Sequence, residues 1–244
     1  MDSIQIISCV LLLVLFFLGF RVMEMNWSYK ISKPWQWEDA VKNGQISKHL
    51  QSLERSYRDK VRLYNMWLQV ERLKQLEVPG AFAELGVYKG ETAALLHEMD
   101  AERKLLLFDT FEGFNARDLA KEQQADPKYS EKNFSDTSLE AVKQRLGEYS
   151  QLEYYPGYFP ESAAGIAKQA YAFVHLDADL YVPTREGLAY FYPLLSPGGV
   201  LLIHDYHHTW PGVKQAVDEF AASISESLVP ISDWQGSVMI IKNR

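Results

Sequence analysis

The stretch from Ala81 to Gly90 constrains the fold of this chain more than any other part of its sequence. It begins as a short apolar run, which is typical of a buried strand. The run reaches Glu84 and Gly86, and a glycine at that point lets the backbone turn sharply or approach a ligand closely. Good helix-forming residues follow Gly90. A strand, a glycine loop and a helix in this order predict a ligand site at the carboxyl end of a parallel sheet.

The spacing of the glycines argues against two common nucleotide sites. The motif reads Glu-x-Gly-x-x-x-Gly, whereas dinucleotide-binding loops read Gly-x-Gly-x-x-Gly. The chain has no Gly-Lys-Ser/Thr sequence, so a phosphate-binding P-loop is not expected either. A carboxylate beside the loop suits a ligand with a cationic or hydroxyl-rich end. An ordinary strand-to-helix turn is the alternative for this motif taken alone.

Length and composition restrict the class of protein. A chain of 244 residues is long enough for one sizeable α/β domain with additional segments. Its net charge of −7 argues against general nucleic-acid binding, and we expect no nucleic-acid partner. Cys9 is the only cysteine and lies in an N-terminal apolar segment. The folded part therefore has no disulfide, no thiolate metal site and no cysteine nucleophile.

The N-terminal segment from Ser3 to Phe20 is uncharged and almost entirely apolar. Its length lies at the short end of what spans a bilayer. Asp2 precedes the segment and bulky residues end it, whereas a signal peptide has a basic start and a small-residue cleavage site. We therefore expect an uncleaved transmembrane anchor over residues 1–22, a juxtamembrane segment over 23–47 and a folded domain over 48–244. A buried core helix is the alternative.

Positive charge lies only on the far side of this segment, at Arg21, Lys30 and Lys33. Because positively charged flanks stay on the cytoplasmic side, the sequence predicts a single-pass membrane protein with its folded domain in the cytoplasm.

The remaining chain alternates between strand and helix patterns. Residues 37–77 predict one or two helices, because apolar residues recur there at helical spacing. Further apolar runs predict strands at 104–109, 152–155, 172–177 and 200–203, and a terminal antiparallel pair at 228–231 and 237–241. Residues 115–138 are polar and aperiodic, which predicts a long lid or substrate loop. The pattern predicts an α/β fold with a Rossmann-like, doubly wound, mostly parallel seven-stranded sheet, N-terminal helices and a terminal antiparallel pair.

Polar side chains follow four of the predicted strands: Glu84 with Gly86, Asp109, Asp177 with Asp179, and His204 with Asp205. In a parallel sheet these strand ends meet at one edge. Carboxylates gathered there with a histidine and without cysteine suit a hard divalent cation such as Mg²⁺. Two alternatives remain: each acid alone can be a helix cap or turn residue, and three histidines, His204, His207 and His208, could instead indicate zinc.

Several motifs resemble the macrocin O-methyltransferase (TylF-type) family. They are Gly80-Ala-Phe-Ala-Glu-Leu-Gly-Val-Tyr-Lys-Gly90, Phe108-Asp-Thr-Phe-Glu-Gly-Phe114, His175-Leu-Asp-Ala-Asp-Leu-Tyr181, Pro197-Gly-Gly199 and Trp210-Pro-Gly-Val-Lys-Gln-Ala-Val-Asp-Glu-Phe220. The motifs occur in the family's order from roughly Val61 to Arg244, and the N-terminal apolar segment lies outside the resemblance.

The resemblance implies a class I S-adenosylmethionine-dependent methyltransferase that acts on sugar hydroxyl groups, typically with Mg²⁺. By position, the cofactor-binding residues would be Glu84, Gly86, Tyr88 and Gly90 around the methionine end and Asp109 at the ribose hydroxyls. The metal ligands would be Asp177, Asp205 and His204. The sequence departs from the family at His204, where a second aspartate is usual. That change removes one carboxylate and could free His204 to act as a base, with His207 as the other candidate base.

The leading hypothesis is a membrane-anchored, divalent-metal-assisted O-methyltransferase that acts on a glycosyl hydroxyl, with a lipid-linked saccharide as one acceptor. A catechol-like phenol is an alternative acceptor. A non-catalytic interaction protein at the membrane is a hypothesis from another class, and fold alone does not exclude it. The spacing of the glycine loop argues against an NAD-dependent oxidoreductase. The sequence leaves a homo-oligomer open.

Overall fold

The computed structural model describes residues 2–125, 129–209 and 211–243, so Trp210 of the last motif and residues 126–128 of the predicted loop lie outside it. The chain divides into two compact units, residues 1–46 and 47–244. The first unit contains α1 (Ser3–Ser32) and α2 (Trp35–Lys42). The second contains the sheet and the remaining described helices.

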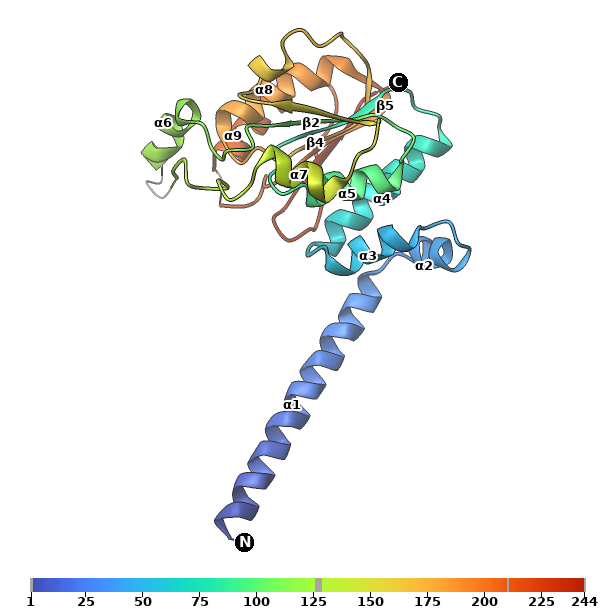
Figure 1. Ribbon diagram of the computed structural model, residues 1–244, viewed down its shortest axis with the longest axis vertical. Helices are drawn as coiled ribbons and strands as arrows, with labels where there is room; N and C mark the ends of the chain where they lie inside the picture. The colour runs from blue at the N-terminus through green and yellow to red at the C-terminus, as the bar shows by residue number, and fades with distance from the viewer. Residues whose placement is uncertain (1, 126–128, 210, 244) are drawn as a thin grey trace. The chain divides into compact units, whose positions relative to one another are not determined.

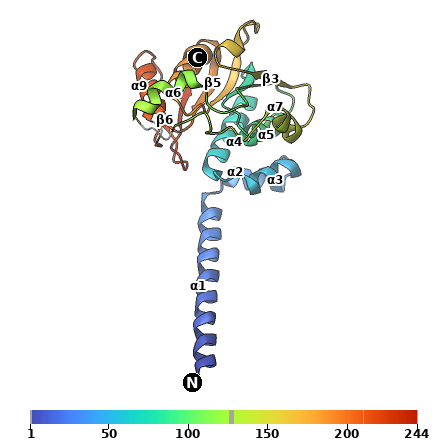
Figure 2. The same cartoon turned by 60° about the vertical axis from the view of Figure 1, so that its left-hand side comes forward.

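The helix α1 is one continuous element of 30 residues (Figure 2). It begins at a capping box, in which the Asp2 side chain accepts from the Gln5 N–H and the Gln5 side chain accepts from the Asp2 N–H. The part from Ser3 to Met25 has a mean hydropathy of 2.6, and its side chains are not buried within the structure. By length and composition this part can cross a membrane, and a signal sequence would have the same properties.

The second unit is built on a seven-stranded sheet in the order β3-β2-β1-β4-β5-β7-β6. The parallel strands are β1 (Ala81–Leu85), β2 (Leu105–Asp109), β3 (Leu152–Pro156), β4 (Tyr171–Leu176) and β5 (Leu195–Ile203). The antiparallel strands are β6 (Val229–Pro230) and β7 (Val238–Ile241), and β7 pairs with β5. The predicted sheet and terminal pair are confirmed.

Helices cover both faces of this sheet, with α8 (Tyr181–Phe191) and α9 (Pro211–Ala221) on one face (Figure 1). The other face carries α4 (Lys60–Gln75), α5 (Glu91–Met99) and α7 (Leu139–Leu146), and α3 (Lys48–Ser56) contacts α5. Because both faces are covered, the central strands are buried along their length, which explains their continuous apolar runs. Two single-turn 3₁₀ helices, Glu161–Ala163 and Tyr192–Leu194, complete the elements of this unit apart from α6.

The structure differs from the predicted elements in three places. Residues 37–77 form parts of three helices rather than one or two, because the non-helical residues 43–47 and 57–59 separate α2, α3 and α4. The strand predicted at 200–203 begins earlier, since β5 spans Leu195–Ile203. The prediction of a continuous loop over 115–138 is wrong for Ala116–Ala125, which forms α6. The Asn115 side chain accepts from the Arg117 N–H there and starts the helix.

Candidate active site

A cavity of about 600 Å³ lies at the carboxyl ends of the parallel strands, within the size range of small-molecule sites. Residues at the ends of β1, β2, β4 and β5 all line it, so the polar strand ends predicted from the sequence meet in one place. Most predicted site residues line this cavity: Glu84, Gly86, Tyr88, Asp109, Asp177, His204 and Asp205. Gly90 and His207 are not among its lining residues.

Glu84 lines the cavity and is 1% exposed. Its Oε1 atom is 2.9 Å from Nδ1 of His175 on β4, and its Oε2 atom is buried without a partner. Burial, together with the negative charge of Asp177, raises the pKa of Glu84 well above its ordinary value. Burial also lowers the pKa of His175 to about 3, so that ring is neutral. A cationic group at the unpaired Oε2 atom would act against this rise and favour the charged form of Glu84.

The two glycines of the loop have different structural tasks. Gly86 has φ +90°, and a Cβ atom built on it would lie 1.9 Å from the carbonyl oxygen of Asp177. Only glycine therefore lets the loop after β1 pass this close to the end of β4. Gly90 has φ +77° and is the N-cap of α5. Its task is to start the helix, which explains why it does not line the cavity.

Asp109, at the end of β2, holds the glycine loop through its carboxylate. Its Oδ2 atom accepts from the backbone N–H groups of Val87 at 2.6 Å and of Tyr88 at 2.8 Å. Its Oδ1 atom accepts from the N–H of Phe111 at 2.6 Å. These bonds fix the loop between β1 and α5. Binding of the ribose hydroxyls by Asp109 stays a prediction.

A segment after α6 closes over Tyr88. The Tyr88 hydroxyl donates to Oδ1 of Asp136 at 2.6 Å, and the Tyr88 carbonyl accepts from the Thr137 hydroxyl at 2.6 Å. The ring of Phe134 packs edge-on against the Tyr88 ring, with centroids 5.1 Å apart. Lys89 also donates to Asp136, at 2.5 Å. This part of the predicted lid is thus fastened to the glycine loop.

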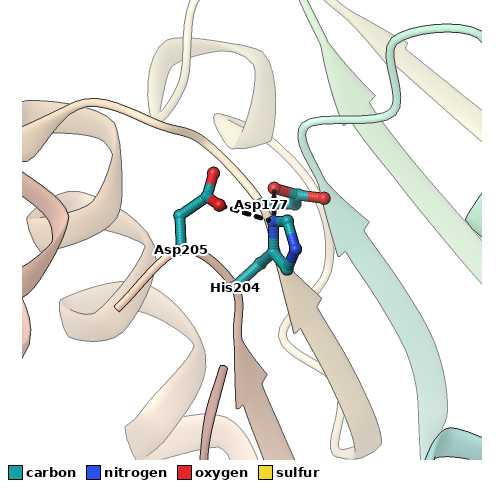
Figure 3. Close-up of side chains that lie close together, drawn as sticks. All are labelled: Asp177, His204 and Asp205. Atoms are coloured by element: carbon teal, nitrogen blue, oxygen red, sulfur yellow. Dashed lines mark hydrogen bonds and ion pairs between the residues drawn. The ribbon is translucent and has the colours of Figure 1, made fainter. Parts of the chain in front are cut away.

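Asp177, His204 and Asp205 come together at the ends of β4 and β5, as Figure 3 shows. The Nδ1 atom of His204 lies 2.7 Å from Oδ1 of Asp177 and 3.3 Å from Oδ1 of Asp205. Burial lowers the pKa of His204, but the charge and hydrogen bond of Asp177 outweigh that effect and raise it to about 9. Burial acts to raise the pKa of Asp177, yet His204 lowers it below its usual range. At neutral pH the two form an imidazolium–carboxylate pair.

Asp179 also lines the cavity, with φ +59°, and its carboxyl group hydrogen-bonds that of Asp205. Burial, and then the negative charges of Asp177 and Asp205, raise the pKa of Asp179 well above its ordinary value. Asp179 thus places a carboxyl group with a raised pKa beside Asp205 in the cavity. Gln235, from the loop before β7, donates to Oδ1 of Asp205 at 2.9 Å.

Arg62, in the first turn of α4, is a site residue that the sequence patterns did not single out. It is 9% exposed, it lines the cavity, and its Nη1 atom lies 3.4 Å from Oδ2 of Asp177. It belongs to a region in which helices were predicted from apolar residues at helical spacing. A charged residue beside such apolar residues would ordinarily face solvent. His175 opens the family motif His175–Tyr181, but its contact with Glu84 was not predicted.

Aromatic side chains form another wall of the cavity: Phe114, Phe134, Tyr158 and Phe159. The Tyr158 hydroxyl donates to Oδ1 of Asp118 on α6 at 2.7 Å. Flat apolar faces beside hydrogen-bonding oxygens suit a ring that carries hydroxyl groups. Asp118, the partner of Tyr158, lies on α6, where a structureless loop had been expected.

The histidines after β5 have different surroundings. His207 is exposed, and its ring packs edge-on against Tyr206. Its backbone N–H donates to the Gly236 carbonyl. The structure therefore does not bring His207 to the cavity. His208 lines the cavity, and its Nδ1 atom is 3.9 Å from Oδ1 of Asp205.

Comparison of the sequence with models of protein families identifies the family of this chain. The sequence model described as macrocin-O-methyltransferase (TylF) matches residues 40–239. The chain belongs to this family. The resemblance in the sequence motifs is thereby confirmed, and the protein is an S-adenosylmethionine-dependent O-methyltransferase.

Relatives and solved structures agree with membership of the TylF family. Mycinamicin III 3''-O-methyltransferase of Micromonospora griseorubida is 31% identical over 190 residues, which cover 72% of this chain and 74% of the relative. A dimethoxyrhamnosyl-tetracenomycin-C 4'-O-methyltransferase of Streptomyces olivaceus is 28% identical over 190 residues, with 72% and 70% covered. The structure of the O-methyltransferase NovP has a TM-score of 0.63 at 27% identity and covers 76% of this chain and 81% of NovP. The α/β fold is thus that of known methyltransferases.

The residues present fit S-adenosylmethionine at one end of the cavity. The buried, unpartnered Oε2 atom of Glu84 can accept a hydrogen bond from an ammonium group such as that of the methionine part. The glycine loop held by Asp109 lines the adjacent wall. Both features lie at the carboxyl edge of the sheet, where ligands of this fold bind.

The predicted metal ligands Asp177, His204 and Asp205 do not fit a resident Mg²⁺ ion in their observed arrangement. Among the described residues, Asp177, His204 and Asp205 place one ligand atom each within 4.8 Å of one another. However, both oxygens of Asp177 and one oxygen of Asp205 already face N–H donors. The third ligand is an imidazole, whereas Mg²⁺ prefers oxygen. Magnesium therefore stays a prediction that these contacts do not favour.

Proposed function

We propose that this methyltransferase transfers a methyl group from S-adenosylmethionine to a hydroxyl group of a sugar in a glycoside or saccharide. The observation that carries the proposal is the shared cavity. The glycine loop after β1 and the carboxylates after β4 and β5 line one space, with Gly86 directly against Asp177. The choice of a sugar rests on the relatives, one of which is named for a rhamnosyl compound.

At the donor end, Glu84 binds the cationic methionine end and Asp109 keeps the loop in its binding shape. S-adenosylmethionine supplies a methyl group on a positively charged sulfur, which makes that methyl electrophilic. The residues of the donor end position it toward the acceptor. Holding two reactants in line removes much of the entropic cost of their encounter.

At the acceptor end, a carboxyl group takes the hydroxyl proton. Asp179 is our candidate, because its carboxyl group lines the cavity and contacts that of Asp205, which can stabilise the proton once it has been taken up. His204 was the base predicted from the sequence, but its Nδ1 atom faces Asp177 and its pKa of about 9 keeps it protonated at neutral pH. We assign it to holding Asp177, and no step of this proposal involves a metal.

A catechol-like phenol is the second candidate acceptor. The wall of Phe114, Tyr158 and Phe159 favours it, because these rings can stack on a planar aromatic ring as well as on a sugar face. The two acceptors differ in the acidity of the hydroxyl group. A phenol gives up its proton far more easily than a sugar hydroxyl, so it depends less on Asp179.

The test uses the full-length protein in mild detergent with radiolabelled S-adenosylmethionine. Acceptors are rhamnosides, other methyl glycosides, lipid-linked saccharides and catechol. We expect labelled sugar products, and Asp179→Asn should lower kcat for glycosides by at least about 100-fold, the usual contribution of a general base. Label in catechol alone would favour the phenol. Binding of S-adenosylhomocysteine without transfer to any acceptor would support the non-catalytic interaction protein and overturn our proposal.

We further propose that α1 is an uncleaved anchor, with residues 1–22 in the membrane, 23–47 at its surface and the methyltransferase domain over 48–244 in the cytoplasm. The support is the apolar composition of Ser3–Met25 and the positive charges that follow the apolar core. An anchor of this kind would bring the domain close to a lipid-linked acceptor.

Membrane fractionation tests the anchor. The full chain should remain in membranes after alkaline carbonate extraction and should keep its N-terminus by Edman sequencing. A protein that lacks its first 25 residues at the N-terminus would indicate a signal sequence instead. Protease added outside sealed spheroplasts should leave the domain intact if it faces the cytoplasm.

A further inference from the structure

Arg62 lies in the wall of the cavity, beside the Asp177 carboxylate. Its side chain is 9% exposed, and Nη1 points to Oδ2 of Asp177 at 3.4 Å. Its guanidinium carbon lies 5.5 Å from the centre of the Tyr57 ring, a distance typical of a cation–π contact. Its Nε atom is buried and has no hydrogen-bond partner. A buried cation is thus held in the cavity wall, against the carboxylate predicted to bind a metal.

The first turn of α4 keeps Arg62 in this place. Asp59 is the N-cap of the helix, and its Oδ1 atom accepts from the Arg62 N–H at 3.0 Å. Its Oδ2 atom accepts from the N–H of Trp234 at 2.9 Å, which ties this turn to the loop that carries Gln235. The backbone that presents the guanidinium is therefore anchored on two sides.

The other oxygen of Asp177 is engaged as well. Nδ1 of His204 lies 2.7 Å from Oδ1, and this nitrogen has a carboxylate oxygen on each side, since Asp205 Oδ1 is 3.3 Å away. A nitrogen between two carboxylate oxygens carries a hydrogen rather than a free lone pair. His204 thus meets Asp177 as a donor, through the atom that would otherwise face a metal (Figure 3).

A divalent ion at Asp177 would meet a like charge. An ion bound to Oδ2 lies about 2.1 Å from that oxygen, which puts it within about 5.5 Å of the Arg62 nitrogen. A like charge at this distance weakens binding strongly in a buried site. Cation binding at Asp177 would require Arg62 to move from its anchored position.

We propose that Arg62 and His204 hold Asp177 in place of a divalent metal ion, so that the acceptor site works without one. This inference rests on the proposed function for its catalytic part. Arg62 supplies a fixed positive charge beside the acceptor site, and both side chains orient the Asp177 carboxylate through their N–H groups. In this scheme Arg62 is a positioning residue that acts through Asp177.

The binding test uses Mn²⁺ alone, since it takes the same oxygen ligands as Mg²⁺ and its electron paramagnetic resonance signal reports the bound fraction. The full-length, EDTA-treated protein in detergent should show no site tighter than about 1 mM, the weak limit of oxygen-ligand sites. His204→Asp should create a site that is at least about tenfold tighter, because it replaces a donor with a carboxylate. Arg62→Met should also tighten Mn²⁺ binding. A merely structural role for Arg62 would not produce that gain.

The second part of the test measures methyl transfer in EDTA and by Arg62 variants. Methyl transfer by the unmodified chain should be unchanged by EDTA, and Arg62→Met should lower kcat while Arg62→Lys restores part of it. Arg58→Met is the matched control, since Arg58 lies outside the cavity and stacks on Trp234. Tight Mn²⁺ binding by the unmodified chain, or loss of activity in EDTA, would overturn the inference. If no acceptor is methylated, the proposed function fails, and Mn²⁺ binding still decides whether Asp177 accepts a divalent ion.

Discussion

Glu84 and His175 stand opposite each other on the neighbouring strands β1 and β4, with their side-chain atoms 2.9 Å apart. Both are buried, at 1% and 0% exposure. Burial holds the His175 ring neutral, so it offers Glu84 a hydrogen bond and no compensating charge. A cation at the unpartnered Oε2 atom would lower the raised pKa of Glu84 and pair with its charged form.

The first prediction concerns this pair. Glu84→Gln should weaken S-adenosylhomocysteine binding by about 10- to 100-fold, because it replaces a charge-assisted hydrogen bond with a neutral one. Isothermal titration calorimetry on the full chain measures the change. Glu98→Gln on α5 is the control, as Glu98 bonds to Ser47 and His49 away from the cavity. Equal affinities for Glu84→Gln and the parent protein would remove Glu84 from the cofactor site.

The second prediction separates loop support from ligand contact at Asp109. Asp109→Ala removes the acceptors of the Val87 and Tyr88 N–H groups. We expect faster hydrogen exchange at these two amides in the absence of any ligand, together with at least about tenfold weaker cofactor-product binding. Exchange measured by mass spectrometry on the ligand-free protein checks the first part. Unchanged exchange with weakened binding would mean that Asp109 contacts the ligand only.

The third prediction concerns the segment that closes over Tyr88. Asp136→Ala removes the hydrogen bond from Tyr88 and the contact with Lys89. Asp136 is exposed, so the melting temperature should hardly change, because surface ion pairs contribute little to stability. The KM for S-adenosylmethionine should rise several-fold, and limited proteolysis after α6 should accelerate. Lys132→Ala in the same segment serves as control. A large fall in melting temperature would show that Asp136 supports the whole domain.

The fourth prediction concerns the pH dependence of stability. The pKa of His204 rises from 6.5 to about 9 on folding, so its contribution is complete below pH 6.5 and is lost as the pH rises through 9. The pKa of Asp177 falls on folding, so its contribution is present above pH 3.8 and is lost at more acidic pH. Between these limits, His204→Asn should lower the unfolding free energy by at most about 3 kcal/mol.

Urea unfolding of the full chain in detergent, followed by tryptophan fluorescence, measures this difference at several pH values. The unmodified protein should lose stability between pH 6.5 and 9 more steeply than His204→Asn. Parallel profiles across this range would show that His204 is not charged in the folded state.

The central strands and the meeting of their polar ends were predictable because buried parallel strands are continuous apolar runs with a fixed direction. Glu84, Asp109 and Asp177 each directly end or follow such a run, so topology alone brings them together. Gly86 was recognisable because it directly follows such a run. Its exact neighbour, the Asp177 carbonyl, was not, since it comes from a strand far along the chain.

Arg62 was not predicted as a site residue, and the reason is physical. It lies 115 residues from Asp177 in the sequence, and a charged residue beside an apolar stripe has the pattern of a solvated helix face. Helix α6 was not predicted because its polar composition has no strong apolar period, although Asp118 and Glu122 are buried on it. In both cases tertiary contacts decide what local sequence leaves open.

The contact between Gly86 and the Asp177 carbonyl has a consequence for how this enzyme can diversify. The close approach of the two main chains sets the spacing between the donor loop and the end of β4. Substitutions at Phe114 and Tyr158 in the aromatic wall can therefore change which acceptor enters without disturbing the alignment of the reacting atoms. The fold separates the part of the site that aligns from the part that is free to vary in evolution.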